Sequence, residues 1–134
     1  MPGEYLLEGL AVPESLSDLH DLLERVAVDH PDVDAGDLMM FETAVIEVAG
    51  NVVEHGRPQG KVLYTFRLQV LPDRVEAGLR EASEAVAPDV VGAEMPDPLA
   101  EQGRGLALSR AMLDELRYER VGAENVWTLV RRRG

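Results

Sequence analysis

Two stretches between residues 62 and 79 alternate strictly between apolar and polar side chains. The apolar positions, which fall on one face of each stretch, are Val62, Tyr64, Phe66, Leu68 and Val70, and then Val75, Ala77 and Leu79. A period of two is typical of strands that bury one face, and the L-P-D-R segment between them is typical of a turn. The chain therefore contains a β-hairpin with one apolar face. A second layer must cover that face, which excludes a fold made of helices alone.

Two amphipathic helices are predicted before the hairpin. Pro13 opens the first, whose apolar side chains recur at spacings of three and four: Leu16, Leu19, Leu23 and Val26. The H-P-D-V-D segment at residues 30–34 ends it. The acidic side chains within residues 34–37 suit the start of a second helix, because they can accept the free N–H groups of its first turn. We expect this second helix to run to His55, with Gly56 as its C-terminal stop.

The remaining segments complete one domain over residues 1–134. Residues 4–10 alternate weakly and predict a short first strand, and residues 125–131 predict the last strand. A third helix is expected after Gly103, with an apolar side consisting of Leu108, Ala111, Met112 and Leu116. Residues 82–102 hold three of the eight prolines and have no clear period, and a connection of this length is often a functional lid. The order predicts an α+β fold: a two-layer sandwich with a mixed, mostly antiparallel sheet and three helices on one face.

The composition excludes several classes of protein. A formal net charge of −12 has the wrong sign for binding nucleic acid, and the basic run at residues 131–133 is expected to be a solvated tail. The chain has no cysteine, so a disulfide framework and a thiolate metal site are excluded. The N-terminus lacks the pattern of a secretory signal, and no apolar run approaches the roughly 20 residues of a membrane span. We expect a cytoplasmic protein with no direct nucleic-acid or membrane partner.

Three polar side chains recur at every fourth position of the second predicted helix: Glu47, Asn51 and His55. They lie along the margin of the apolar stripe, where side chains can face a crevice between helix and sheet. A polar margin is common in purely structural helices, and a carboxylate beside an imidazole can form an ion pair without any ligand. The functional interpretation is that the carboxylate acts as a general base and the amide oxygen ligates Mg²⁺, which prefers oxygen donors.

The segment Gly103-Arg104-Gly105 precedes the third predicted helix. Two glycines let the backbone approach a ligand closely, and the free N–H groups of a helix's first turn attract phosphate. A simple hinge before an ordinary helix is the structural alternative. Taken with the polar helix margin and the long connection, this segment favours a site for a magnesium–nucleotide complex.

The order of these motifs resembles the GHKL ATPase superfamily, and within it the anti-sigma factor serine kinases. F-E-T-A-V-I-E-V-A-G-N-V-V-E-H-G, residues 41–56, is similar to the N-box of that superfamily. G-R-G-L-A-L-S-R-A-M-L-D-E-L and N-V-W-T-L-V-R are similar to the second glycine box, last helix and closing strand of that kinase branch. The similarity runs from about residue 5 to residue 133. It implies a GHKL-type sandwich that binds ATP and Mg²⁺.

The resemblance implies a role for each matching residue. Glu47 is expected to be the general base, Asn51 to ligate the Mg²⁺ that bridges the ATP phosphates, and His55 to lie near the site. The other expected nucleotide contacts come from the second glycine box and the last strand: Gly103, Arg104, Gly105, Leu106 and Thr128.

One segment departs from the family pattern. At the end of the second hairpin strand the family usually carries Asp-x-Gly, where Asp accepts the adenine amino group and Gly leaves room for the ring. Here Glu81-Ala82-Ser83 takes that place. Glu81 keeps the acceptor but extends it by one methylene, and Ser83 adds a Cβ and a hydroxyl. Both are expected to contact the nucleotide.

The resemblance implies a function in transcription control. A protein of this kind phosphorylates a serine of an anti-sigma-factor antagonist with ATP and, usually as a homodimer, holds a sigma factor inactive. The altered adenine segment leaves an alternative open: a catalytically weak or inactive relative that regulates by protein binding only.

Overall fold

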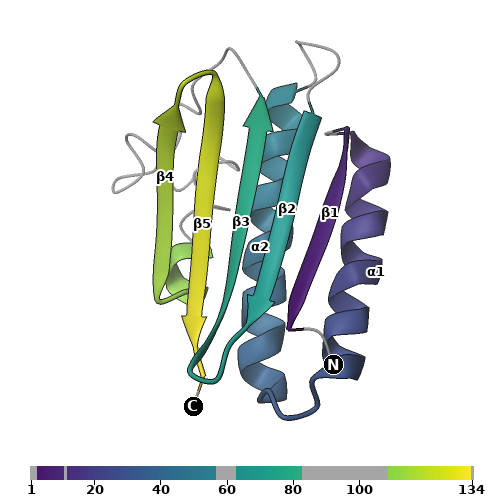
Figure 1. Ribbon diagram of the computed structural model, residues 1–134, viewed down its shortest axis with the longest axis vertical. Coiled ribbons are helices and arrows are strands. Elements are labelled where there is room, and N and C mark those ends of the chain that lie inside the picture. Colours follow the sequence, from purple (N-terminus) through teal and green to yellow (C-terminus); the bar gives the residue numbers. More distant parts are fainter. Residues whose placement is uncertain (1–2, 11, 57–62, 83–108, 134) are drawn as a thin grey trace.

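The protein is a two-layer α+β sandwich, as predicted. The computed structural model describes residues 3–10, 12–56, 63–82 and 109–133, without the side chains of residues 54–56. The elements are β1 (Glu4–Leu10), α1 (Pro13–Asp29), α2 (Ala35–Gly56), β2 (Leu63–Val70), β3 (Arg74–Ala82), β4 (Glu115–Val121) and β5 (Glu124–Arg132). Residues 109–112 are also helical. The helices lie behind one face of a five-stranded sheet with the strand order β1-β2-β3-β5-β4 (Figure 1).

All pairings between the described strands are antiparallel, so no parallel pair of the expected mixed sheet occurs among them. The predicted hairpin is confirmed: β2 and β3 pair as far as Val70 and Val75, and the Leu71 N–H closes the turn on the Arg74 carbonyl at 2.8 Å. The two central strands, β3 and β5, come from segments far apart in the sequence. The expected lid at residues 82–102 lies outside the described residues from residue 83 onward.

One strand is absent from the sequence prediction. Leu116 was assigned to the third helix, but the helical residues end at Met112 and Leu116 lies in β4. The reason is that the backbone joins the sheet at once, because the Asp114 N–H donates to the Val130 carbonyl at 2.8 Å. β4 then turns into β5 through Gly122 and Ala123, and only Gly122 has a positive φ, 60°. This is the pattern of a type II′ hairpin, which needs glycine at its first central position.

The core lies between the sheet and the helices, and α2 fills its centre. The buried apolar side chains of α2 are Leu38, Phe41, Ala44, Val45, Val48, Ala49, Val52 and Val53. The sheet contributes Tyr5, Tyr64, Phe66, Leu68, Val75, Ala77, Leu79, Trp127 and Leu129. The predicted inward face of the hairpin is therefore confirmed, apart from Val62, which is not described, and Val70, which is half-buried. Each fully buried large aliphatic or aromatic side chain contributes about 1.5–3 kcal/mol.

Both ends of α2 agree with the sequence prediction. The Asp34 carboxylate accepts the Asp37 N–H at 3.0 Å, so it caps the first turn of the helix. The helix ends at Gly56. These residues fix where the helix that carries Glu47 and Asn51 begins and ends.

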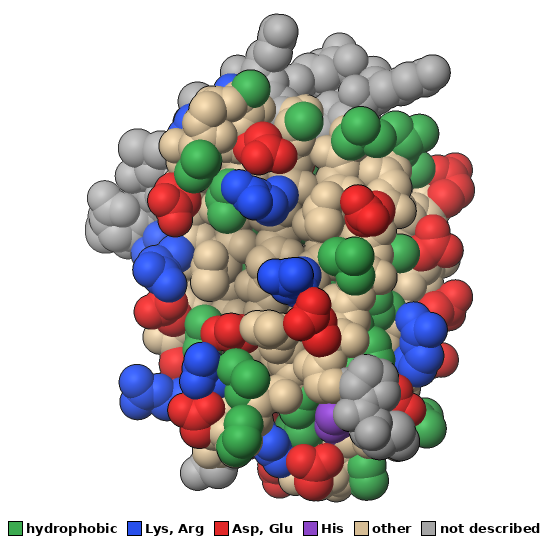
Figure 2. All heavy atoms as spheres, in the orientation of Figure 1, with side chains coloured by type: hydrophobic (Ala, Val, Ile, Leu, Met, Phe, Trp, Pro, Cys, Tyr) green, Lys and Arg blue, Asp and Glu red, His purple; other side chains and the backbone are tan. Residues whose placement is uncertain are grey.

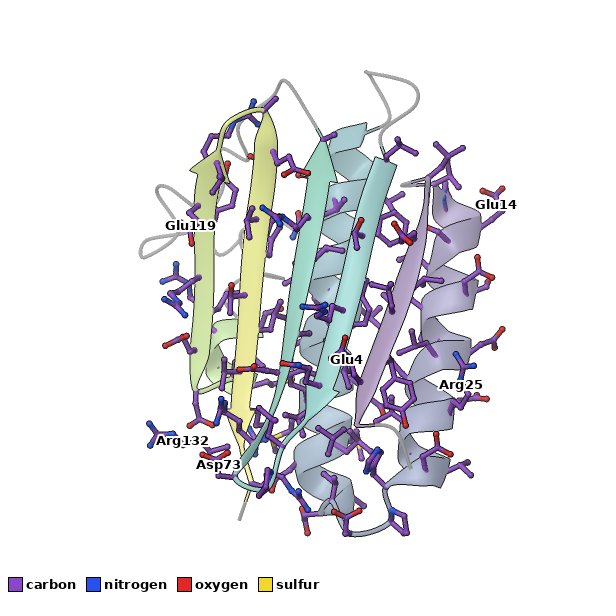
Figure 3. All side chains as sticks on the ribbon, in the orientation of Figure 1. Glu4, Glu14, Arg25, Asp73, Glu119 and Arg132 are labelled. Carbon is purple, nitrogen blue, oxygen red and sulfur yellow. The ribbon has the colours of Figure 1, made fainter. Side chains whose placement is uncertain are left out.

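The negative charge of the described chain is concentrated in the helical layer. α1 carries five Asp or Glu residues and one Arg, and α2 carries four acidic residues and no Lys or Arg. The five strands together carry seven acidic residues and seven arginines. Figure 2 shows acidic and basic side chains scattered together over the open face of the sheet. Glu14 and Arg25 project from the outer side of α1 (Figure 3).

Two of the three C-terminal arginines hold the fold together, so the expectation of a solvated tail is wrong for them. Arg131 donates from Nε and Nη2 to the Asp37 carboxylate at 3.1 and 2.8 Å, and from Nη1 to the Met112 carbonyl at 2.7 Å. Arg133 forms an ion pair with Asp32 at 2.8 Å. These contacts tie the end of β5 to the segment that begins α2.

Replacing Arg131 by Ala should lower the free energy of unfolding by about 1–3 kcal/mol, because a largely buried carboxylate and a carbonyl lose their donor. Arg132→Ala is the matched control. The Arg132 side chain extends outward at the end of the sheet (Figure 3), and we expect a change below about 0.5 kcal/mol. Urea unfolding of both variants measures the difference, and equal effects would contradict a structural role for the pair.

Tyr5 joins β1 to the end of α1. Its hydroxyl donates to the Asp29 carboxylate at 2.7 Å, and its ring meets the His30 ring edge-on at 6.1 Å. Burial, and then the hydrogen bond to Asp29, raises the pKa of Tyr5 to about 12. The native state therefore keeps the Tyr5 proton to a higher pH than the unfolded chain, in which the pKa of tyrosine has its ordinary value of about 10.

This pKa shift predicts a loss of stability at alkaline pH. Between pH 10 and 12 the unfolded state binds fewer protons than the native state at Tyr5, so the free energy of unfolding should fall as pH rises through this window. Below pH 10 the contribution is fully present. Tyr5→Phe should remove this part of the decline, as measured by urea unfolding at a series of pH values. An unchanged slope in the variant would mean that Tyr5 is not responsible.

Candidate functional site

Glu47 and Asn51 lie one turn apart on α2. Asn51 is buried, and its Nδ2 donates to the Glu47 backbone carbonyl at 3.5 Å. This long bond uses the amide nitrogen, so it does not engage the oxygen that would ligate a cation. His55 lies in the last turn of the same helix, but its side chain is outside the described residues.

The Glu47 carboxylate is half-buried and can be reached from the outer surface. It lines one end of a groove of about 230 Å³ between α1 and α2, together with His20, Leu23, Met39, Glu42, Thr43 and Ile46. Burial raises the pKa of Glu42 in this groove. Glu47 therefore combines a position beside buried Asn51 with access for a second molecule. A general base needs such access, because it must take a proton from a group that arrives from outside.

A second polar group lies at the end of β3, on the face of the sheet that packs against the helices. Glu81 is 1% exposed, and Asn125 of β5 is its register partner and is equally buried. Asn125 Nδ2 donates to Glu81 Oε1 at 2.9 Å. On the other side, Asn125 Oδ1 accepts from the Tyr118 hydroxyl and, at 3.1 Å, from Arg120 Nη1. The chain therefore holds a carboxylate in its interior by a network of hydrogen bonds that spans three strands.

Sequence reasoning missed Asn125, Tyr118 and Arg120. The signal was available in β5, where Asn125 occupies the same alternating face as Trp127 and Leu129. A polar residue at an inward position of a strand needs a buried partner, and Glu81 is that partner. Tyr118 and Arg120 follow from the same alternation in β4, which was not recognised as a strand. Glu119 between them points outward (Figure 3).

Trp127 borders this polar network. Its ring lies 5.1 Å from that of Tyr118, and its indole Nε1 is buried with no hydrogen-bond acceptor among the described residues. A buried N–H donor and a buried carboxylate thus lie on neighbouring positions of the same face.

The structure does not bring Thr128 to this site. In β5 the residues on either side of it, Trp127 and Leu129, point to the helices, so Thr128 points to the opposite, open face of the sheet. There it lines a hollow of about 320 Å³ with Gly78 and Arg67, among others. The resemblance implies a nucleotide contact for Thr128, but the alternation of the strand directs its side chain to the open face of the sheet.

The remaining predicted contacts lie outside the described residues: Ser83, Gly103, Arg104, Gly105 and Leu106. The described chain resumes at Ser109, which is fully buried and whose hydroxyl donates to the Ala44 carbonyl of α2 at 3.5 Å. The start of the 109–112 helix therefore packs against α2, one turn before Glu47. Among the described side chains, no three His, Asp or Glu residues converge to hold a metal ion.

Comparison with known proteins identifies the domain. Residues 10–131 match the family model of the histidine kinase-like ATPase domain. No curated protein matches the chain significantly. In the described part of the chain, no helix is both long enough and apolar enough to cross a membrane. The match covers nearly the whole sequence and agrees with an antiparallel sheet packed against the apolar face of α2, and the chain thus belongs to the family of histidine kinase-like ATPase domains.

Proposed function

We propose that this domain binds ATP with Mg²⁺ and transfers the γ-phosphoryl group to a serine of an anti-sigma-factor antagonist, and that it also sequesters a sigma factor. The observation that carries the proposal is the pairing on α2 of a buried amide, Asn51, with a carboxylate that a partner can reach, Glu47. Family membership supports nucleotide binding. The kinase reaction and the partners are extensions of it that rest on the resemblance of residues 41–56 and 103–116.

The residues fit a bound magnesium–nucleotide complex by their chemistry. The Asn51 amide oxygen is a hard donor of the kind Mg²⁺ prefers, and Mg²⁺ usually takes only one or two protein ligands beside substrate phosphates. The buried Glu81 carboxylate accepts hydrogen bonds, as recognition of an amino-bearing base requires. Bound Mg-ATP supplies the phosphoryl group and neutralises the charge that develops on its oxygens.

The chain's own contribution to phosphoryl transfer would be positioning and proton removal. Glu47 would accept the hydroxyl proton of the incoming serine while the serine oxygen bonds to the γ-phosphorus and the bond from that phosphorus to ADP breaks. Asn51 would hold the cation, which in turn would orient the phosphates. Because the two residues share one helix, their separation is set by the backbone of α2 and does not depend on a loop.

A second candidate function is regulation by protein binding alone, and the length of the Glu81 side chain favours it. A glutamate extends the carboxylate one methylene further than the expected aspartate, which makes it a poorer fit for adenine. A lost or strained hydrogen bond to the base costs about 1–3 kcal/mol, or roughly 5- to 150-fold in affinity. In that case the domain keeps its partner surface without an efficient reaction.

Calorimetric titration with ATP, with and without Mg²⁺, separates the two candidates. The kinase proposal predicts micromolar binding that depends on Mg²⁺ and that is lost in Asn51→Ala. Glu47→Gln should bind Mg-ATP like the wild type but transfer phosphate to candidate antagonist proteins about 10²–10⁴ times more slowly. Glu42→Gln is the matched control on the same helix and should change neither quantity. Absence of binding at millimolar nucleotide would leave only the binding function.

The charge distribution supports protein partners with basic surfaces. The helical layer carries nine acidic residues and one Arg over α1 and α2, which attracts a basic partner at long range. Association with a sigma factor should therefore slow as salt rises from about 0.05 to 0.5 M, where charges more than a few ångströms apart become screened. Stopped-flow measurement of the association rate tests this. A rate that does not change with salt would place the contact elsewhere.

Dimerisation, proposed from the same resemblance, is measured by sedimentation of the free domain.

A further inference from the structure

Asn125 has an unusual environment for an amide in a strand. It is 1% exposed, it lies opposite Glu81 in the β3–β5 ladder, and it is also the register partner of Arg120 in the β4–β5 ladder. Its Oδ1 accepts from both Tyr118 and Arg120, and its Nδ2 donates to Glu81. The amide thus links a cation and a hydroxyl on one side to a carboxylate on the other.

This arrangement permits one orientation of the amide only. Tyr118 can act as a donor and Arg120 has donors but no acceptor, so both must face the Asn125 oxygen. The nitrogen must then face Glu81, which as a carboxylate offers only acceptors. If the Asn125 amide were flipped, its N–H groups would face the Arg120 guanidinium and its oxygen would face the Glu81 carboxylate. Both contacts would be repulsive. Asn125 consequently imposes an acceptor role on Glu81.

We propose that Asn125 is a positioning residue for base recognition: it holds the Glu81 carboxylate as an acceptor that selects nucleotides with an exocyclic amino group over those with an oxo group. The inference rests on the proposed nucleotide-binding function and assigns its base specificity to residues of β4 and β5. Tyr118 and Arg120 act through Asn125 and do not touch the nucleotide. ATP is favoured because the 6-amino group of adenine donates to Glu81, whereas the 6-oxo group of guanine meets a like-charged oxygen.

Asn125→Asp tests this inference with little change in shape. The new side chain keeps the oxygen that Tyr118 and Arg120 need, but it replaces the donor to Glu81 by a second acceptor. Two carboxyl groups that are buried in contact share a proton, and the pKa of one of them rises strongly. As pH rises, that proton is lost and repulsion displaces Glu81. A merely structural role for Asn125 would not make nucleotide affinity depend on pH in this way.

The measurement is calorimetric titration of wild type and Asn125→Asp with Mg-ATP and Mg-GTP, at intervals from about pH 6 to pH 9, where such shared protons are lost. We expect the affinity of the variant relative to wild type to fall by at least about tenfold across this range. The neighbouring titratable groups are Tyr118 and Arg120 of β4 and Tyr64 of β2. They are present in both proteins, so their effects cancel in the ratio of the two affinities. Tyr118→Phe, which leaves the donor to Glu81 in place, should show no such trend. Thermal unfolding at each pH checks that the variant remains folded.

A neutral second variant keeps the test valid if Asn125→Asp does not fold. In Glu81→Gln, Asn125 Nδ2 should donate to the oxygen of the new side-chain amide, and the NH₂ group of that new amide should then face the base. The preference for ATP over GTP should therefore fall or reverse. If the wild type binds no nucleotide, the proposed function and this inference fall together. If the wild type binds Mg-ATP but neither variant changes pH dependence or base preference, the proposed function stands and the positioning role of Asn125 is wrong.

Discussion

Burial of the apolar stripe of α2 against the two central strands is the interaction on which the structure depends. Val48 and Phe41 are within 1% of complete burial, and the strands opposite contribute Trp127 and Leu79. Turning the helix by even a small angle would expose part of this stripe, so its rotation is fixed by the hydrophobic effect. The position of Glu47 and Asn51 at the margin follows from that constraint. The site needs no strained backbone to place these groups, because the core does it.

The sequence predicted the parts of the fold that have one clear period. The hairpin and both long helices were recognisable because their apolar positions fit either a period of two or one of 3.6, and not both. β4 was missed because Leu116 continues the helical spacing of Met112, and only the pairing of Asp114 with β5 decides between helix and strand. Thr128 was expected at the site for a related reason. A motif shows which residues are neighbours along the chain, whereas the face to which a strand residue points depends on whether its position in the strand is odd or even. The inward position of Asn125 follows from the alternation in β5, but its pairing with Glu81 depends on which strand lies beside β3, and no local pattern contains that information.

The described structure gives the two proposed functions a common physical basis. Glu47 and Asn51 lie on α2, and Glu81, Asn125 and Arg120 form a network of hydrogen bonds across β3, β5 and β4. The first pair is what phosphoryl transfer would use, and the second decides whether adenine fits. Under the proposed functions, catalysis and nucleotide affinity would depend on different elements and could be lost separately. A variant that lost either pair would keep the acidic helical layer to which we assign partner binding.

The pairing of β3 with β5 has a consequence for how the chain folds. Their ladder joins Ala82 to Glu124 and continues over nine residue pairs, so it closes a loop that contains the whole segment between them. The entropy of closing a loop grows only slowly with its length, by about 0.6 kcal/mol for each doubling, so the length of this segment matters less to equilibrium stability than the pairing of β4 within it. The rate is a different matter, because pairing between distant segments is slow compared with helix formation. We therefore expect the central ladder to form last and to set the time in which a newly made chain acquires its site.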